Sequence, residues 1–464
     1  MRIFNDLISR KRNTDLSLKK TYNKSRPKEK HSAFCWAPFT SLRFHRNGFV
    51  QVCCHHIDYY SLSERTLKEI WFGTELQQMR KKMKQYDIPS SCNFCKSNYL
   101  NGNFSNVNAL AFDHYPPNKS RYPAFMDFSL ENTCNLACVM CDAGLSSTIQ
   151  RNKNIGQKER SFVYDEKFIK QLDEFIPHLK GAVFTGGEPF LIESNYKIWN
   201  NIVRINPQMD LYITTNATIW NDKIKETLDK GRFNITASVD SFTKSSYEQI
   251  RLGASFEKTM ENIMKFADYC KLEGTQFSIA VCPMQINAFE IPDIVKNCNY
   301  NGWGFSYNTL MKPWNLAIWS MAEYEIKKLL EYYQKTNFDT SENETKKKNI
   351  NRYNALIELI ELWCIKMKSI HEEDPVRQKN LIENKLMAKE ILLALLTNKT
   401  ETNLVNRKMD IVLEKLPLMF FTEDFLIYLK QLANPLIINE FIEKDENTIS
   451  DHLTILAFQF LLMA

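Results

Sequence analysis

Long apolar runs are missing from this chain of 464 residues. No segment approaches the roughly 18 consecutive apolar residues that a membrane-spanning helix needs, so the sequence predicts no membrane association. The first twenty residues, MRIFNDLISRKRNTDLSLKK, also lack the hydrophobic core of a signal peptide. We therefore expect a cytoplasmic protein.

A basic surface is missing from most of the chain as well. Of the 60 Lys and Arg residues, ten lie in residues 1–30 beside three Asp and Glu, whereas the rest of the chain holds 50 basic and 51 acidic residues. Nucleic-acid binding needs an extended basic surface, so the composition does not favour it. The positive excess belongs to an N-terminal arm, which is either a solvated tail or a holder for an acidic partner.

The sequence pattern divides the chain into four regions. Residues 1–31 are the basic arm, with a short helix predicted around Phe4, Leu7 and Ile8. Residues 32–120 are rich in cysteine and aromatic residues, and one helix is predicted over Glu64–Lys84. Residues 121–322 alternate between strand and helix patterns. Residues 323–464 are predicted to be helical, with a polar loop over Thr336–Lys348 and, at the C-terminal LTILAFQFLLMA, a helix that is either buried or docks a partner.

The third region predicts an α/β fold. Its strands are predicted over Ala124–Leu130, Gly181–Thr185, Asp210–Thr215, Asn234–Val239, Thr275–Cys282 and Trp303–Asn308. The helices between them are predicted over Asp165–Ile176, Glu193–Ile205, Asn221–Lys230, Ser255–Leu272 and Ile291–Cys298. Six such units favour a parallel sheet that forms a partial (β/α)6 barrel of the TIM type. In such folds the chemistry lies at the C-terminal ends of the strands.

Twelve cysteines in a chain without an export signal are poor candidates for disulfides, which makes metal ligation the better hypothesis. Cys134, Cys138 and Cys141 form a C-x3-C-x2-C pattern directly after the first predicted barrel strand. Three thiolates can hold three irons of a 4Fe–4S cluster and leave the fourth iron open to a substrate or cofactor. The alternative is that they are buried, inert thiols.

With this pattern the chain resembles radical S-adenosylmethionine (radical SAM) enzymes, because further motifs follow in order. The run Thr185-Gly186-Gly187-Glu188-Pro189 stands where the family has its GGE motif. The resemblance implies that the glycines let the backbone approach SAM and that Glu188 accepts from its ammonium. It also places polar residues near SAM at later strand ends, namely Thr214, Asn216, Ser238, Asp240, Arg251 and Asn287.

Three of these assignments have simpler alternatives. Thr214 and Ser238 are also suitable residues for capping the helices that follow them. Arg251 resembles the arginine that pairs with the SAM carboxylate, but it is also explained as a surface ion-pair residue. Met140 departs from the family pattern, since relatives carry an aromatic residue just before the third cysteine; a thioether can fill the same apolar space near the adenine.

A second iron–sulfur site is predicted in the N-terminal region. The pattern Cys35-x12-Gly48-x4-Cys53, followed by Cys92-x2-Cys95, resembles the SPASM/twitch extension of radical SAM enzymes, here placed before the barrel. Asn101 stands where a full SPASM pattern has its next cysteine, so the resemblance implies one closed auxiliary 4Fe–4S cluster. Cys54 is an alternative to Cys53, and a four-cysteine zinc site is an alternative to the cluster. The histidines at positions 45, 55 and 56 are further ligand candidates or ordinary surface and core residues.

The other cysteines are interpreted as mostly small buried hydrophobic residues. Cys282 closes the fifth predicted strand and is a candidate hydrogen-atom donor to a substrate radical.

The resemblance implies reductive cleavage of SAM to a 5′-deoxyadenosyl radical that abstracts hydrogen from a substrate, with electrons from a reductant such as flavodoxin or ferredoxin. Two classes of substrate remain open: a ribosomally synthesised precursor peptide, modified by a cross-link, a thioether or epimerisation, and a small molecule such as a sugar or alcohol. A non-catalytic iron–sulfur electron carrier is a third hypothesis, although it needs neither an open iron nor a GGE motif.

Overall fold

The computed structural model describes most of the chain. The described residues are 16–100, 102, 104, 107–114, 121–154, 162–339, 343–371, 375–396, 409–414, 416, 426, 449 and 453. The helix predicted around Phe4 therefore lies outside the described residues, as does most of the C-terminal apolar segment. The chain divides into two compact units, Met1–Ala280 and Val281–Ala464.

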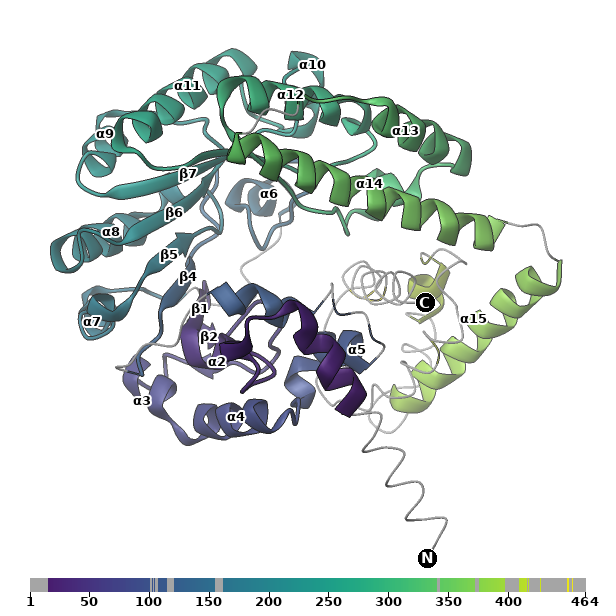
Figure 1. Ribbon diagram of the computed structural model, residues 1–464, viewed down its shortest axis with the longest axis horizontal. Helices are drawn as coiled ribbons and strands as arrows, with labels where there is room; N and C mark the ends of the chain where they lie inside the picture. The colour runs from purple at the N-terminus through teal and green to yellow at the C-terminus, as the bar shows by residue number, and fades with distance from the viewer. Residues whose placement is uncertain are drawn as a thin grey trace, which may run out of the picture. The chain divides into compact units, whose positions relative to one another are not determined.

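A largely parallel sheet forms the centre of the first unit (Figure 1). Its strands are β1 (Ser41–His45), β2 (Phe49–Gln51), β3 (Tyr60–Ser61), β4 (Phe125–Ser129), β5 (Gly181–Phe184), β6 (Asp210–Thr215), β7 (Arg232–Ser238) and β8 (Phe277–Val281). Strands β4 to β8 lie side by side in chain order, and each pairs in parallel with the next. This arrangement confirms the predicted α/β fold with a parallel sheet.

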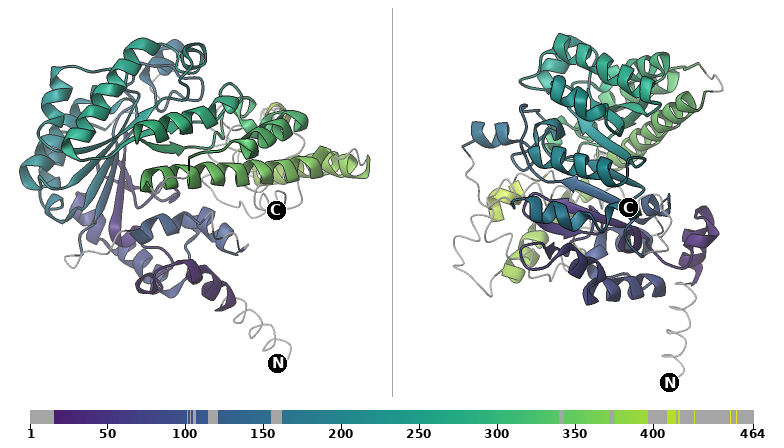
Figure 2. Two further views of the ribbon diagram at one scale, coloured as in Figure 1. Left: turned by 45° about the horizontal axis from the view of Figure 1, so that its top comes forward. Right: turned by 90° about the vertical axis from the view of Figure 1, so that its left-hand side faces the viewer.

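One face of this sheet is covered by helices α7 (Glu166–Leu172), α8 (Glu193–Ile205), α9 (Asp222–Leu228) and α11 (Phe256–Glu273) (Figures 1 and 2). Aromatic side chains fill the space beneath them. The ring of Phe128 stacks on those of Phe44 and Phe184, with centroids 4.9 and 4.8 Å apart, and Phe168 of α7 packs against Phe44. Burying each such ring contributes about 1.5–3 kcal/mol, so this face forms the core.

The N-terminal region extends the sheet, which the sequence did not predict. Strand β1 pairs in parallel with β4, from Ser41 opposite Phe125 to His45 opposite Ser129, while β2 and β3 follow antiparallel. The cysteine-rich region therefore shares one continuous sheet with the barrel strands. Further helices of this unit are α2 (Ala37–Thr40), α3 (Leu67–Phe72), α4 (Thr74–Gln85), α5 (Asn93–Leu100), α6 (Ser147–Asn152) and α10 (Lys244–Ile250).

The single helix predicted over Glu64–Lys84 is wrong, because two helices occupy that segment. Thr66 caps α3 through a capping box with Glu69, and the helix ends at Gly73. Gly73 is in an extended conformation with ψ 163°, and it serves as the N-cap of α4. A Cβ at Gly73 would lie 2.5 Å from the carbonyl oxygen of Glu69, so the break depends on a glycine.

The second half of the basic arm packs onto the first unit. Residues 16–22 are helical, and the hydroxyl of Tyr22 donates to the carbonyl of Phe34 at 3.0 Å. Arg26 forms two buried hydrogen bonds with the carboxylate of Asp113, of 2.7 and 2.8 Å. Since a bidentate pair fixes both position and orientation, this part of the arm is ordered rather than solvated.

The second unit is mainly helical. It contains α12 (Ile291–Asn301), β9 (Gly304–Tyr307), α13 (Glu323–Lys335), α14 (Glu344–His371) and α15 (Pro375–Leu396). The loop predicted over Thr336–Lys348 is shorter than expected, because α14 already begins at Glu344. Within the described residues, the helices are all too short or too polar to cross a membrane.

Candidate functional site

The loop that follows β4 carries the three-cysteine pattern. Cys134, Cys138 and Cys141 are all half-buried and free of disulfides. The backbone of this loop is held by the segment after α10, since the amides of Ala137 and Val139 donate to the carbonyls of Leu252 and Ile250, at 2.9 and 3.0 Å. This pairing places Arg251 beside the cysteine loop.

The start of the same loop is fixed by residues of the following helix. The amide of Cys134 donates to the hydroxyl of Ser147 at 3.1 Å, and the hydroxyl of Thr148 donates to the carbonyl of Cys134 at 2.8 Å. Sequence reasoning missed these two residues. The available signal was the Ser-Ser-Thr run after the third cysteine, whose first member, Ser146, is the N-cap of α6.

Gly186 and Gly187 let the loop after β5 lie directly against the cysteine loop. The amide of Gly187 donates to the carbonyl of Glu131 at 3.0 Å, and that of Glu188 donates to the carbonyl of Thr133 at 2.7 Å. A Cβ at Gly187 would lie 2.2 Å from the Thr133 oxygen, and Gly186 has a φ of 109°. The glycines therefore allow close packing of two backbones, and their approach to SAM stays a prediction.

Glu188 connects the ends of β5 and β6. It is 1% exposed, and its carboxylate accepts from the Thr215 hydroxyl and the Asn216 amide, both at 2.7 Å, and from the amide of Phe190 at 3.2 Å. Burial raises the pKa of this carboxyl, and the hydrogen bonds from Asn216, Thr215 and Phe190 oppose that rise. Three of its roughly four acceptor positions are thus taken by the protein itself.

The side chain of Asn216 is directed at the cysteine loop. Its Nδ2 lies 3.9 Å from Cys134 Sγ and donates to Asn135 Oδ1 at 2.9 Å, while its Oδ1 accepts from the Thr218 hydroxyl at 2.7 Å. Hydrogen bonds to ligand sulfurs are one of the ways in which proteins adjust iron–sulfur clusters. The structure therefore brings Asn216 to the first cysteine, a contact that its place at a strand end only partly predicts.

Arg251 and Asp240 form a buried ion pair. Arg251 Nη2 lies 2.7 Å from Asp240 Oδ2, and the two side chains are 8% and 1% exposed, so Arg251 is not a surface residue. Burial raises the pKa of the Cys138 thiol, and the charge of Arg251 is the first influence that lowers it. One positive charge is thus held close to the middle cysteine.

Two other predicted residues lie at strand ends without capping helices. Thr214 and Ser238 are both half-buried. Helix α9 is capped by Asn221, whose side chain accepts from the amide of Ile224, and the N-cap position of α10 is Thr243. The helix-capping alternative for Thr214 and Ser238 is therefore wrong. Met140 is half-buried in the cysteine loop.

Cys282 and Asn287 belong to the second unit. Asn287 is fully buried, its Nδ2 donates to the carbonyl of Cys282 at 3.1 Å, and its Oδ1 accepts from the amide of Met284 at 2.7 Å. Both ends of this amide thus hold the turn that follows β8. Cys282 itself is half-buried.

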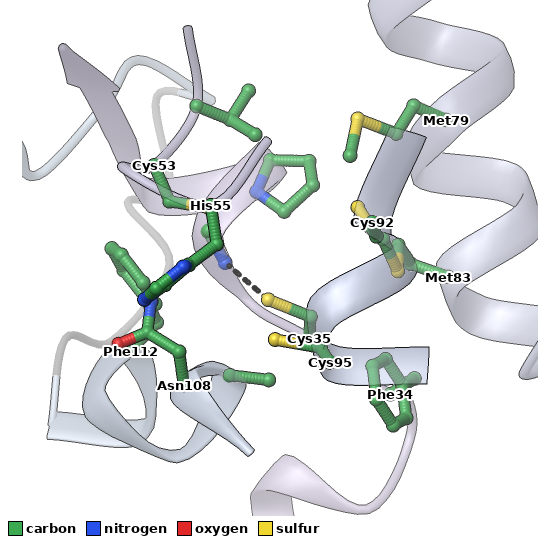
Figure 3. A pocket seen from close by; sticks show the side chains of 14 residues that line it. Phe34, Cys35, Cys53, His55, Met79, Met83, Cys92, Cys95, Asn108 and Phe112 are labelled. Carbon is green, nitrogen blue, oxygen red and sulfur yellow. Dashed lines mark hydrogen bonds between the residues drawn. The ribbon is translucent and has the colours of Figure 1, made fainter. Parts of the chain in front are cut away.

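The four cysteines predicted for the auxiliary site converge on one pocket of the N-terminal region (Figure 3). Cys35, Cys53, Cys92 and Cys95 all line it and are each at most 9% exposed. Burial raises the pKa of every one of these thiols, to about 12 for Cys53 and about 11 for Cys95. Neighbouring cysteines raise the pKa of Cys35 further.

Cys54 does not line this pocket. It is exposed, and the side chain of Asn108 approaches its sulfur at 4.0 Å. Of the three histidine candidates, His55 lines the pocket and stacks on Phe94 with ring centroids 4.1 Å apart. His56 is buried, and His45 contacts the side chain of Gln51. The geometry thus groups Cys53, rather than Cys54, with the other three cysteines.

Both cysteine groups fit iron–sulfur clusters by the chemistry of their donors. Among the described residues, no three His, Cys, Asp or Glu side chains converge closely enough to hold a single metal ion. Each iron of a 4Fe–4S cluster takes its own thiolate, so the ligands of a cluster stand further apart than those of a single metal ion. The three half-buried thiols would leave one position of a cluster open, and the four buried thiols would supply a closed set.

Comparison with protein families assigns both regions. Residues 129–284 match the model of the radical SAM superfamily, and residues 35–96 match that of the SPASM iron–sulfur cluster-binding domain. The chain therefore carries a radical SAM domain, with a SPASM domain ahead of it. The radical SAM domain indicates an enzyme that uses SAM and a 4Fe–4S cluster, and the SPASM domain indicates auxiliary iron–sulfur binding rather than zinc.

Individual relatives resemble only part of the chain. A GTP 3′,8-cyclase of Clostridium botulinum (strain Hall) is 27% identical over 163 residues, which are 35% of this chain and 46% of the cyclase. That of Sulfurimonas denitrificans is 24% identical over 180 residues, 38% of this chain and 53% of the cyclase. The chain thus spans about half the length of these relatives.

Solved structures that match part of the chain include native anSMEcpe with bound AdoMet, at 17% identity and a TM-score of 0.35. That match covers 45% of this chain and 58% of the other. Streptococcus suis SuiB bound to S-adenosylmethionine has 15% identity and a TM-score of 0.34, with 57% and 58% covered.

Proposed function

We propose that this chain is a radical SAM enzyme that modifies a ribosomally synthesised peptide by forming a cross-link or thioether or by epimerisation. The observation that carries the proposal is the convergence of four buried cysteines on one pocket, in a domain whose strand β1 continues the barrel sheet. A closed auxiliary cluster in that position provides an acceptor for the electron that remains after oxidative bond formation in a substrate.

In this proposal Cys134, Cys138 and Cys141 would hold the first cluster, and its remaining position would be open to SAM. Asn216 supports the ligand Cys134 by its contact with the sulfur. Arg251, held by Asp240, supplies the positive charge for the SAM carboxylate. Met140, Thr214, Ser238 and Asn287 are assigned to the surroundings of SAM.

The glycine-rich loop is assigned a positioning role. Glu188 ties the ends of β5 and β6 together, so the loop that carries Gly186 and Gly187 is rigid where it meets the cysteine loop. The remaining acceptor position of Glu188 is assigned to an N–H of the SAM amino group. A rigid frame of this kind orients the reacting atoms before the reaction and excludes water.

With both cofactors bound, the chemistry they supply is one-electron cleavage of SAM to methionine and a 5′-deoxyadenosyl radical, which removes a hydrogen atom from the substrate. Cys35, Cys53, Cys92 and Cys95 hold the auxiliary cluster away from solvent. Cys282 is assigned as a hydrogen-atom donor for an epimerisation. The partners are a cytoplasmic reductant, such as a flavodoxin or ferredoxin, and the precursor peptide.

The second candidate is a radical SAM reaction on a small molecule, which has support from the sequence relatives. The proteins that match at 24–27% identity are GTP 3′,8-cyclases, whose name states a nucleotide substrate. The match covers 35–38% of this chain, so it bears on the shared domain more than on the substrate.

Anaerobic turnover tests the proposal. The reconstituted protein is incubated with SAM, a reductant and short peptides encoded beside its gene, and the peptides are analysed by mass spectrometry. A loss of two hydrogen masses supports cross-linking. An unchanged mass in ordinary water, together with the gain of one deuterium when the reaction is run in heavy water, supports epimerisation. Unmodified peptides, together with tight binding and turnover of a nucleotide or sugar, would favour the second candidate.

A further inference from the structure

The face of the sheet opposite the aromatic core carries an ion pair that no role above uses. Arg43 of β1 stands directly opposite Asp127 of β4 in the strand register. Their neighbours Phe44 and Phe128 point into the core, so Arg43 and Asp127 point to the other face. The side chains are 26% and 21% exposed, and Arg43 Nη1 lies 3.5 Å from Asp127 Oδ2.

This pair is left with unused hydrogen-bonding capacity. Arg43 Nε and Asp127 Oδ1 are buried atoms that have no hydrogen-bond partner among the described residues. An unsatisfied buried donor or acceptor costs about 1–3 kcal/mol, so such atoms usually have a partner in the working state of a protein. Here one donor and one acceptor are left together on a partly exposed sheet face.

The location of the pair connects the two iron–sulfur regions. Asp127 lies on β4, the strand that leads into the loop of Cys134, Cys138 and Cys141. Arg43 lies on β1 of the cysteine-rich region, and β1 pairs directly with β4. The pair therefore joins the strand that leads into the three-cysteine loop to a strand of the cysteine-rich region.

We propose that Arg43 and Asp127 form a binding site for an amide group of the substrate, either a peptide bond or an Asn or Gln side chain. The carbonyl of an amide accepts from the guanidinium, and its N–H donates to the carboxylate. A free carboxylate is repelled by Asp127 and a free ammonium by Arg43, whereas a neutral group that both donates and accepts satisfies both. This inference rests on the proposed peptide substrate and names the residues that hold it.

Equilibrium binding to the reconstituted full-length protein with SAM tests the site. The probe is acetyl-Ala-Ala-Ala-amide, titrated by saturation-transfer NMR, together with an ester analogue that lacks the central N–H. We expect Asp127→Asn and Arg43→Lys to weaken binding of the amide about tenfold, as for loss of a hydrogen bond to a charged group. The ester is expected to bind the wild type more weakly than the amide does. Asp127→Asn is expected to bind the ester and the amide equally weakly.

The first unit offers a matched control. Arg232 and Asp210 also face each other across adjacent parallel strands, with Arg232 Nε 3.1 Å from Asp210 Oδ1, but they lie at the N-terminal ends of their strands, whereas Arg43 and Asp127 lie in the middle of theirs. Asp210→Asn is expected to bind the probe like the wild type. Iron and sulfide content and the circular dichroism spectrum establish that each variant is folded and loaded.

Failure of the wild type to bind the capped peptide would overturn the site, as would equal binding by Asp127→Asn and Asp210→Asn. These results are distinguishable from failure of the proposed function. Amide binding that depends on Asp127, with no SAM-dependent change in any peptide, would keep the site and reject peptide modification. If the wild type and Asp127→Asn modify a peptide at the same rate and with the same affinity, the proposed function is kept and the site is rejected.

Discussion

Asp240 holds the guanidinium of Arg251 in a buried ion pair of 2.7 Å beside the cysteine loop. The carboxylate comes from a residue with a φ of 65°, a left-handed conformation that Asn and Asp tolerate better than most residues. The turn after β7 therefore gives the side chain of Asp240 its direction, and that direction places one positive charge near Cys138. The ion pair thus holds the positive charge of Arg251 in a fixed position beside the cysteine loop.

We expect Asp240→Asn to lower the free energy of unfolding by roughly 3 kcal/mol, because it leaves the buried charge of Arg251 without a counter-ion. Asn keeps the left-handed backbone, so the change tests charge rather than strain. Urea unfolding of the reconstituted protein under anaerobic conditions measures it. Asp210→Asn, in the pair with Arg232 whose side chains are 40% and 39% exposed, is the control and should cost less than about 1 kcal/mol. Equal losses in both variants would contradict the assigned importance of the buried pair.

Part of this architecture was predictable from the sequence because its signals are local. The bounds of β6 and α8 agree with the predicted ones, and the other barrel strands agree within about two residues at each end. The alternation of apolar and polar residues and the regular spacing of strands and helices are sufficient to predict such elements. Strand β1 was missed because its partner β4 begins only at Phe125, far along the chain. Strand β3 was missed because it has only two residues. Pairing across such a distance leaves no periodicity to detect.

The site residues show the same division. Cysteine spacing predicted which four thiols gather in the N-terminal pocket, but it left Cys53 and Cys54 as alternatives, since adjacent residues differ only in direction. The side chain of Asn287 forms hydrogen bonds with the backbone of the turn after β8, and no sequence motif encodes the backbone geometry on which these bonds depend. The loop contacts of Gly187 likewise depend on how two distant backbones approach each other.

The adjacent cysteines provide a direct test of the auxiliary site. Cys53→Ala should remove a ligand from the closed cluster, so iron per protein should fall from about eight toward four after reconstitution, whereas Cys54→Ala should keep about eight. The physical reason is that Cys53 lines the pocket and Cys54 does not. Iron and sulfide analysis measures both. Loss of iron in Cys54→Ala with retention in Cys53→Ala would reverse the assignment.

The three-cysteine loop is tested in the complementary way. The triple variant Cys134→Ala, Cys138→Ala, Cys141→Ala should form no 5′-deoxyadenosine from SAM, yet it should retain about four irons per protein in the auxiliary site. Chromatography of the SAM cleavage products and iron analysis provide the two measurements. Continued formation of 5′-deoxyadenosine would show that SAM is cleaved elsewhere.

Gly187→Ala tests the packing of the glycine-rich loop against the cysteine loop. The added Cβ would meet the Thr133 carbonyl at 2.2 Å, so the two loops must separate. We expect a loss of about 1–3 kcal/mol in the free energy of unfolding, as for overpacking, together with a weaker EPR signal from the SAM cluster. Gly274→Ala is the control: Gly274 has a φ of 65° but no atoms within 4 Å of the added Cβ, so it should destabilise the protein and leave that signal intact. An undiminished signal in Gly187→Ala would refute the role of the contact.

The contact between Asn216 Nδ2 and Cys134 Sγ predicts an effect on redox potential. A donor to a ligand sulfur stabilises the more negative, reduced form of a cluster, so Asn216→Leu should lower the midpoint potential of the SAM cluster. A hydrogen bond to a charged group contributes about 1.5 kcal/mol, which sets a shift of up to about 60 mV for one electron. An EPR-monitored redox titration measures it. The control is Asn262→Leu, which removes a buried amide that donates to the Ala217 carbonyl at 3.1 Å and not to sulfur. If both variants shift the potential equally, the effect arises from loop packing and not from the hydrogen bond of Asn216.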